Sequence, residues 1–235
     1  MEVKILRVAG IVEATKAMRL PMKSGDKSDS DYCWDRCHDM EEEALCKYCP
    51  HAKRENGEFE CTACKEYMGI WVMGPKDHDL SMKLIHAGSD HRKHIRLIDV
   101  WMEIKAPLYW WKETDTYRFG VDKVSESTMH TLMSKEITIN DFECTESSKE
   151  ELTFSHDCGY YPSWIDTLER MRRVDRFEEL NQALPQSYLQ TRICKLSYEA
   201  LRNIYHARKD HKLKEWHLFC ETLERLPYSE FITEE

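Results

Sequence analysis

Apolar and polar residues alternate in the middle of the chain, where every second residue from Ile98 to Ile104 is apolar. A period of two predicts a strand with one buried face, and Pro107 is expected to end it. Another strand is predicted over 69–73, where apolar residues cluster. Residues 3–18 predict a short strand followed by a helix that begins at Ile11.

Helical spacing of apolar residues appears in four later segments and predicts amphipathic helices there. Mixed with the strands, these helices predict an α+β fold in a single domain over residues 1–235. The predicted helices run from an Asp77 or Asp79 cap to Gly88, from Ser163 to Leu184 (stripe Ile165, Leu168, Met171, Val174, Phe177), from Ser197 through Leu201, Ile204 and Tyr205, and from Leu213 through Trp216 and Cys220 to Leu223.

Residues 26–66 differ from the rest, with 12 acidic and 6 basic residues and little apolar periodicity. Two CxxC pairs in this insert can hold one ion in a closed tetrahedron of thiolates, which predicts structural zinc. Asn56-Gly57 lies between the pairs and favours a chain reversal. The alternative is reduced cysteines without a metal. The predicted ligands are Cys46, Cys49, Cys61 and Cys64, and a second group (Cys33, Cys37, His38, His51) leaves metal binding open.

The chain carries 34 basic and 43 acidic residues, a net charge of −9. This balance argues against broad electrostatic binding to nucleic acid or to an anionic membrane. The first residues, Met1–Arg7, are charged and alternating, unlike a secretory signal, and no apolar run reaches the length of a membrane span. We expect a cytoplasmic protein.

Arg208 shares its helix face with apolar residues, so its guanidinium is expected to point inward. A buried cation needs an anionic or polar partner, either a ligand or an internal salt bridge. Two further segments suggest a binding site. Tyr109–Trp111 could stack a planar ring or pack in the core, and Ser125–His130 could open a helix that binds phosphate or is merely well capped. The histidines His86, His91 and His94 are interpreted as surface or anion-contacting groups.

In this order along the chain, several segments resemble the flavin-dependent thymidylate synthase family over about residues 68–225. The family reads a glycine-histidine segment, a strand ending in Lys-Ala-Pro, an arginine-rich motif, Leu-Pro followed by Tyr, Asn-x4-Arg, and a segment with Gln-Trp-Glu. The matches here are Gly88–His94, Lys105–Pro107, Leu184-Pro185 with Tyr188, Asn203-x4-Arg208, and Glu215-Trp216. The cysteine insert falls outside the resemblance.

The arginine-rich motif has diverged. Aligned without gaps, it keeps its first arginine as Arg118, and Thr128 replaces its second serine. The histidine and second arginine that the family associates with flavin become Phe119 and Gly120. Aligning Thr116–Arg118 with the first three residues of the motif instead gives no better match. The resemblance therefore implies that the residues that contact the nucleotide are partly kept, whereas most of the residues that contact flavin have changed.

What the resemblance implies is a protein that binds a pyrimidine deoxynucleotide such as dUMP and transfers a one-carbon unit to it from a folate, as a homotetramer. Arg208 would polarise the base. FAD is the family's cofactor. The alternative is an inactive nucleotide-binding or assembly protein on the same scaffold. Substrate contacts are expected from Arg118, Ser127, Thr128, His130, Arg192 and Tyr109, and cofactor contacts from His94 and Asn203.

Overall fold

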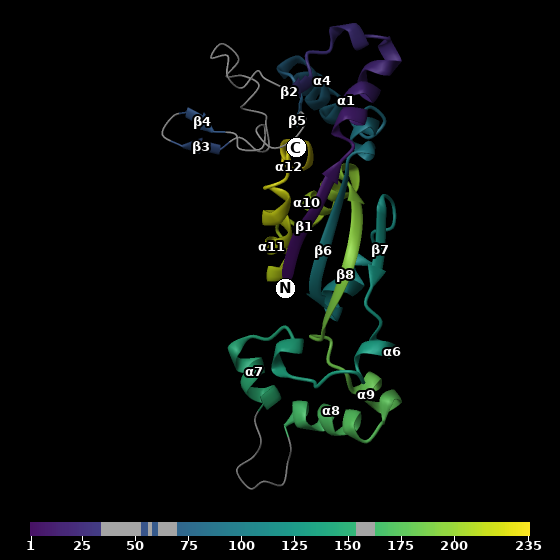
Figure 1. Cartoon of the computed structure of the whole chain (residues 1–235), viewed down its shortest axis with the longest axis vertical. Helices are drawn as coiled ribbons and strands as arrows, with labels where there is room; N and C mark the ends of the chain where they lie inside the picture. The colour runs from purple at the N-terminus through teal and green to yellow at the C-terminus, as the bar shows by residue number, and fades with distance from the viewer. Residues whose placement is uncertain (34–52, 56–57, 61–69, 154–162) are drawn as a thin grey trace. The chain divides into compact units, whose positions relative to one another are not determined.

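The computed structural model describes residues 1–33, 53–55, 58–60, 70–153 and 163–235 (Figure 1). It divides into two compact units, each built from several stretches of the chain. Unit 1 comprises Met1–Ile5, Met102–Arg118 and Asp122–Cys194, and unit 2 comprises Leu6–Trp101, Phe119–Val121 and Lys195–Glu235. That the whole chain is one domain stays a prediction.

Four strands form a sheet in the order β1-β6-β8-β7, and each strand runs through residues of both units. The predicted alternation is confirmed in β6, because Val100, Met102 and Ile104 are almost completely buried. Strand β6 ends at Pro107, as expected. The bounds are β1 Glu2–Ala9, β6 Asp99–Pro107, β7 Val121–Ser125 and β8 Leu189–Ser197.

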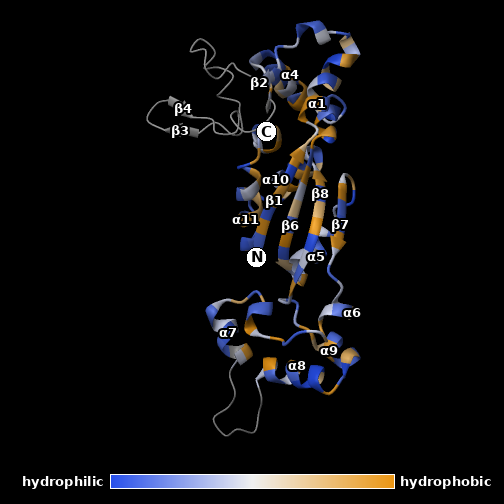
Figure 2. Cartoon of the chain, in the orientation of Figure 1, coloured by the Kyte–Doolittle hydropathy of each residue, from blue (hydrophilic) through white to orange (hydrophobic). Residues whose placement is uncertain are grey.

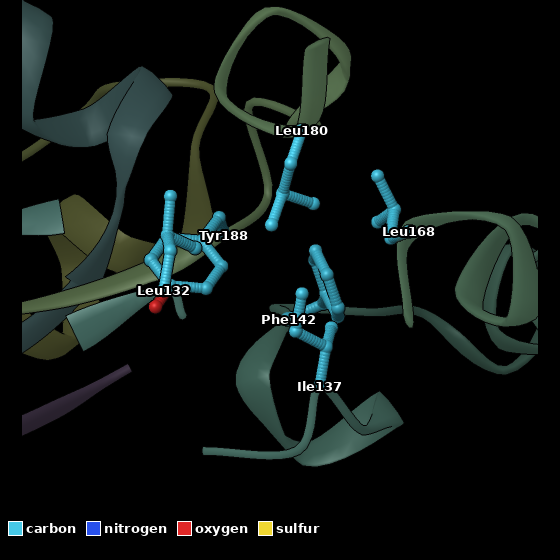
Figure 3. Packing of buried hydrophobic residues seen from close by; sticks show 6 residues of the cluster. All are labelled: Leu132, Ile137, Phe142, Leu168, Leu180 and Tyr188. Carbon is cyan, nitrogen blue, oxygen red and sulfur yellow. The ribbon is translucent and has the colours of Figure 1, made fainter. Parts of the chain in front are cut away.

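Unit 1 contains segments of all four strands together with several short helices. Its core is a cluster of six buried side chains, which Figure 3 shows converging. Phe142 and Tyr188 meet edge to face there, with ring centroids 5.8 Å apart. The other members of the cluster are Leu132, Ile137, Leu168 and Leu180. The helices are α5 Leu108–Thr114, α6 Thr128–Thr131, η5 Ile139–Asp141 (3-10), α7 Glu146–Thr153, α8 Trp164–Arg173 and α9 Phe177–Ala183.

The helix predicted from Ser163 to Leu184 is wrong in one respect, because the structure has two helices there. Helix α8 begins after Ser163, whose hydroxyl accepts from the N–H of Asp166, and it mixes hydrophobic and hydrophilic residues (Figure 2). The chain then breaks at Asp175, which has a left-handed φ of 58°. Aspartate tolerates this conformation better than most residues. Val174, predicted to join the apolar stripe, is exposed instead.

Unit 2 contains the predicted helix that follows β1 and the two predicted C-terminal helices, which are confirmed as α1, α10 and α11. Leu201, Ile204, Trp216 and Leu223 are buried in its core. Its elements beyond the sheet are α1 Ile11–Arg19, η1 Leu20–Met22, η2 Gly25–Lys27, β2 Asp31–Cys33, β3 Lys53–Glu55, β4 Glu58–Glu60, β5 Ile70–Val72, α4 Pro75–His86, η4 Arg92–Leu97, α10 Tyr198–Arg208, α11 Lys214–Leu223 and α12 Glu230–Thr233.

Helix α4 begins at a different residue from the one predicted. Its N-cap is Gly74, and the carboxylate of Asp29 accepts from the backbone N–H groups of Lys76 and Asp77. Asp77 is fully buried and binds Arg19 instead of capping the helix. The predicted stop is confirmed, since the helix ends at His86 and is followed by Gly88 in a left-handed conformation.

Two short ribbons lie at and within the cysteine-rich insert. Strand β2 pairs antiparallel with β5, with Cys33 opposite Ile70, so the two ends of segment 34–69 meet. Strand β3 pairs antiparallel with β4, with Glu55 opposite Glu58. The strands on either side of Asn56-Gly57 are thus antiparallel, whereas Asn56 and Gly57 themselves lie outside the described residues. The proposed zinc ligands, Cys46, Cys49, Cys61 and Cys64, lie outside the described residues.

Candidate functional site

Arg192, an expected substrate contact on β8, is held in unit 1 by three neighbours. Its Nη1 donates to Oδ1 of Asp115 at 2.8 Å, and its Nε donates to Oε1 of Gln190 at 3.0 Å. Its guanidinium carbon lies 4.2 Å from the ring centroid of Trp111, in a cation–π contact. A guanidinium held on several sides keeps a defined orientation for an incoming anion.

Lys123, on the neighbouring strand β7, points at the same carboxylate. Its Nζ donates to Oδ1 of Asp115 and to the carbonyl oxygen of Thr114, both at 2.8 Å. Burial pushes the pKa of Asp115 up, but the hydrogen bond from Lys123 and the charge of Arg192 outweigh it and hold the pKa below its usual value. Sequence reasoning did not include Lys123 in the site, because only the pairing of these elements reveals it.

The segment that carries Ser127 and Thr128 is tied to β8 beside Arg192. The N–H of Glu126 donates to the carbonyl oxygen of Thr191 at 3.0 Å, and its own carbonyl oxygen accepts from Nε2 of Gln190 at 3.1 Å. The structure thus brings Ser127 and Thr128, both half-buried, to the β8 segment that holds Arg192.

The helix expected to open within Ser125–His130 is present but short. Ser125 still belongs to β7, and α6 has only four residues, Thr128–Thr131. Its N-cap, Ser127, makes no side-chain cap hydrogen bond, so the predicted capping is wrong. A four-residue helix also has too little dipole to bind phosphate on its own. His130 and Arg118 are exposed.

The adjacent tryptophans of α5 do not form an open stacking surface. Trp110 and Trp111 are at most 1% exposed and meet edge to face, with ring centroids 4.9 Å apart. The indole N–H of Trp111 donates to the carbonyl oxygen of Gln190 at 2.9 Å. Core packing is therefore correct for both residues, and Tyr109, which is half-buried, is the remaining aromatic candidate.

Arg208 is the last residue of α10, in unit 2, and is half-buried. Its guanidinium carbon lies 4.9 Å from the ring centroid of Trp216, which is fully buried. A guanidinium over the face of a ring is attracted by the ring's electrons, so Trp216 helps to hold Arg208 in place. The fully inward arginine of this helix is Arg202, whose Nη1 donates to the carbonyl oxygen of Phe231 at 3.2 Å. Asn203 is exposed.

His94 is buried, so its interpretation as a surface or anion-contacting group is wrong. Its Nε2 lies 2.7 Å from Oγ of Ser81, and burial lowers its pKa to about 4. The imidazole is therefore neutral at pH 7. Its Nδ1 has no hydrogen-bond partner among the described residues, which leaves one polar atom for a neutral contact. Arg92 nearby is paired with Glu199, with Nε and Oε2 2.8 Å apart.

The two positions that the resemblance links to flavin do not fit such a cofactor. Phe119 is 95% exposed. Gly120 has a φ of 68°, and a Cβ there would lie 2.5 Å from Oγ of Ser197. A side chain at position 120 would therefore push the Ser197 hydroxyl aside and sit in a left-handed backbone conformation, which disfavours an arginine there. The residues present therefore cannot hold FAD in the way the family does.

Metal binding is not found elsewhere in the site. Among the described residues, no group of three or more His, Cys, Asp or Glu could hold an ion. Two buried cysteines, Cys194 and Cys220, have thiols whose pKa is raised by burial to about 11. These thiols are therefore protonated and inert at neutral pH. Helices in the part of the chain that the structure covers are too short or too polar to cross a membrane.

Comparison with solved structures identifies the fold. The flavin-dependent thymidylate synthase ThyX from Helicobacter pylori, complexed with FAD and dUMP, is 18% identical and gives a TM-score of 0.62, covering 99% of this chain and 98% of the other. A second structure of that protein with FAD and dUMP gives 0.61 at 18% identity, covering 100% and 97%.

The UMP/dUMP methylase PolB from Streptomyces cacaoi, bound with 5-Br dUMP, is 11% identical and gives a TM-score of 0.54. The match covers 95% of this chain and 88% of the PolB chain. No protein-family model matches the sequence, and neither does any curated protein. The chain thus has the fold of flavin-dependent thymidylate synthases, and the expected α+β class is confirmed.

Proposed function

We propose that this protein is a divergent relative of the flavin-dependent thymidylate synthases that binds a pyrimidine deoxynucleotide such as dUMP. The observation that carries the proposal is the shared fold over nearly the whole chain with proteins crystallised with dUMP. Fold alone does not fix a ligand, because function resides in the site. Support from the site comes from Arg208 and from the cations beside β8.

In this proposal, the phosphate lies at the cations of unit 1. Arg192 and Arg118 supply guanidinium groups, which match the oxygens of a phosphate, and the hydroxyls of Ser127 and Thr128 donate hydrogen bonds. His130 and Tyr109 complete the nucleotide contacts. Every one of these residues belongs to unit 1.

The base contact is assigned to Arg208. A guanidinium beside a pyrimidine carbonyl stabilises negative charge that develops on the ring when its carbon attacks an electrophile. Trp216 supports the guanidinium through the ring contact. His94 and Asn203 are assigned to a cofactor, and a folate is the proposed one-carbon donor. FAD is assigned no step here, because Phe119 and Gly120 lack the imidazole and guanidinium that the resemblance links to flavin, and a flavin bound by this protein would use other contacts.

The reaction class proposed is transfer of a one-carbon unit to the pyrimidine. Transfer as a hydroxymethyl group breaks both carbon–nitrogen bonds of the methylene bridge in the folate donor. It forms one carbon–carbon bond to the ring and one carbon–oxygen bond to water, and the ring proton and one water proton pass to the two folate nitrogens. That step is redox-neutral and needs no hydride donor. A methyl product does need one, so the rewritten flavin positions favour hydroxymethyl transfer. The alternative function is an inactive nucleotide-binding or assembly protein.

Calorimetric titration with dUMP and deoxyuridine tests the nucleotide proposal. Arg208→Ala is expected to lose about tenfold or more in affinity while its circular dichroism is unchanged, and Arg208→Lys to retain part of it. Arg225→Ala, an exposed arginine of the same unit, serves as the control. No binding of either ligand to the native protein, or unfolding of Arg208→Ala as its sole effect, contradicts the proposal.

Mass spectrometry of dUMP incubated with methylene-folate separates the two functions. A hydroxymethyl or methyl adduct indicates an enzyme, whereas tight binding without any product indicates the inactive alternative. We further propose a homotetramer in the cytoplasm, measured by light scattering after gel filtration and by fractionation of cells. Zinc in the insert completes the proposal.

A further inference from the structure

Two cations of unit 1 share a single carboxylate oxygen. Nζ of Lys123 and Nη1 of Arg192 each lie 2.8 Å from Oδ1 of Asp115. Asp115, Lys123 and Arg192 are called the Asp115 cluster below. With two positive charges and one negative charge, the cluster carries an excess positive charge that an additional anion would neutralise.

Neutral groups hold both cations in place. Lys123 also donates to the carbonyl oxygen of Thr114 at 2.8 Å. Arg192 also donates to Gln190 at 3.0 Å and stacks on Trp111. Each cation therefore has contacts besides Asp115 that hold it if the carboxylate moves away, unlike an ion pair whose two members orient only each other.

Asp115 is the exposed member of the cluster. Its side chain is 48% exposed, whereas those of Lys123 and Arg192 are each 14% exposed. Asp115 also follows the last residue of α5, where the carbonyl ends of the helix disfavour a negative charge. A solvent-facing carboxylate on two fixed and covered cations is the member that a competing anion displaces most easily.

We propose that Asp115 is an internal competitor for the phosphate group of the nucleotide, and that a phosphate monoester binds Lys123 and Arg192 by displacing it. This inference rests on the proposed function for the identity of the nucleotide, but not for the chemistry of the anion. It adds Lys123 as a phosphate ligand and makes Asp115 a residue that lowers affinity. The site selects phosphorylated over unphosphorylated ligands.

The test measures binding of inorganic phosphate, dUMP and deoxyuridine to the native protein and to Asp115→Asn. Removing one negative charge next to the phosphate is expected to tighten both phosphate-containing ligands about fivefold or more and to leave deoxyuridine unchanged. Asp122→Asn is the matched control, because Asp122 precedes Lys123 on β7 and its side chain points to the opposite face of the strand. Asp115→Ser repeats the test, and thermal melting checks that each variant folds.

The outcomes separate this inference from the proposed function. Equal or weaker phosphate and dUMP binding by Asp115→Asn overturns the competitor role while nucleotide binding stands. Tighter binding of inorganic phosphate without any binding of dUMP supports the competitor role and contradicts the nucleotide proposal. Absence of binding of every ligand to both proteins overturns both. In the Asp115→Asn background, Lys123→Met is expected to reverse the gain.

Discussion

Glu169 in α8 gives a prediction whose size follows from the structure. Its carboxylate accepts from Arg172 at 2.6 and 2.7 Å, from Arg173 at 2.9 Å, and from the backbone N–H of Ile137 at 3.1 Å. The hydrogen bond from Arg172, together with those from Ile137 and Arg173, lowers its pKa to about 2 although burial acts in the opposite direction. Glu169 thereby fixes Ile137 in the core cluster of unit 1.

The pKa shift sets an upper limit on the stabilisation by this charge. A fall of the pKa from its ordinary value of 4.5 to about 2 corresponds to about 3 kcal/mol. Arg173 is 66% exposed, so solvent screens part of that interaction. We therefore expect Glu169→Gln to lower the free energy of unfolding by about 2 kcal/mol at pH 7.

The pH dependence has a defined sign. A carboxyl group whose pKa is lower in the folded state stabilises fully above its unfolded pKa, and this stabilisation is lost as the pH falls through 4.5 toward 2. Urea unfolding followed by tryptophan fluorescence measures the difference between native protein and Glu169→Gln at each pH. Glu178→Gln, an exposed residue of α9, should stay within about 0.5 kcal/mol of the native protein at pH 7. A difference for Glu169→Gln that is the same at pH 7 and pH 2.5 would refute the reasoning.

Three further predictions concern unit 2 and the insert. Asp77→Ala leaves the buried cation of Arg19 without its carboxylate and should lower the free energy of unfolding by about 3–5 kcal/mol in urea, whereas the exposed Asp79→Ala should not; equal losses would contradict this. Gly120→Ala places a Cβ in a left-handed conformation against Ser197 and should lower the free energy of unfolding by about 1–2 kcal/mol or more in the same assay. An unchanged urea midpoint would contradict this. Elemental analysis of the purified protein should find zinc in proportion to chain, retained in Cys144→Ser and lost in Cys46→Ser; a metal-free native protein would contradict the zinc site.

Local patterns predicted those elements whose packing follows a single period. Strand β6 buries every second residue, so its alternation is visible in the sequence. Helix α10 begins where Ser197 accepts from the N–H of Ala200, a capping interaction between near neighbours. In both cases the interactions that define the element lie within a few residues.

Where distant residues decide the structure, the same patterns failed. The break between α8 and α9 is hidden because Leu168 and Leu180 enter one core cluster from both helices. The cap of α4 comes from Asp29, far away in sequence. Lys123 and Arg192 come to the same carboxylate oxygen of Asp115 through the pairing of β7 with β8, although Arg192 is far from the other two residues in sequence. A sequence read by itself contains no signal for such pairings.

Gly120 is one of the two positions that the resemblance links to flavin, and it is connected to the helix that carries Arg208. Its carbonyl oxygen accepts from the N–H of Ser197 at 2.9 Å, and the Ser197 hydroxyl in turn caps α10, the helix that ends at Arg208. A side chain at position 120 would displace Ser197 and thereby disturb the start of that helix. Gly120→Arg is therefore expected to weaken nucleotide binding without creating a flavin site, because Gly120 belongs to the framework that carries Arg208.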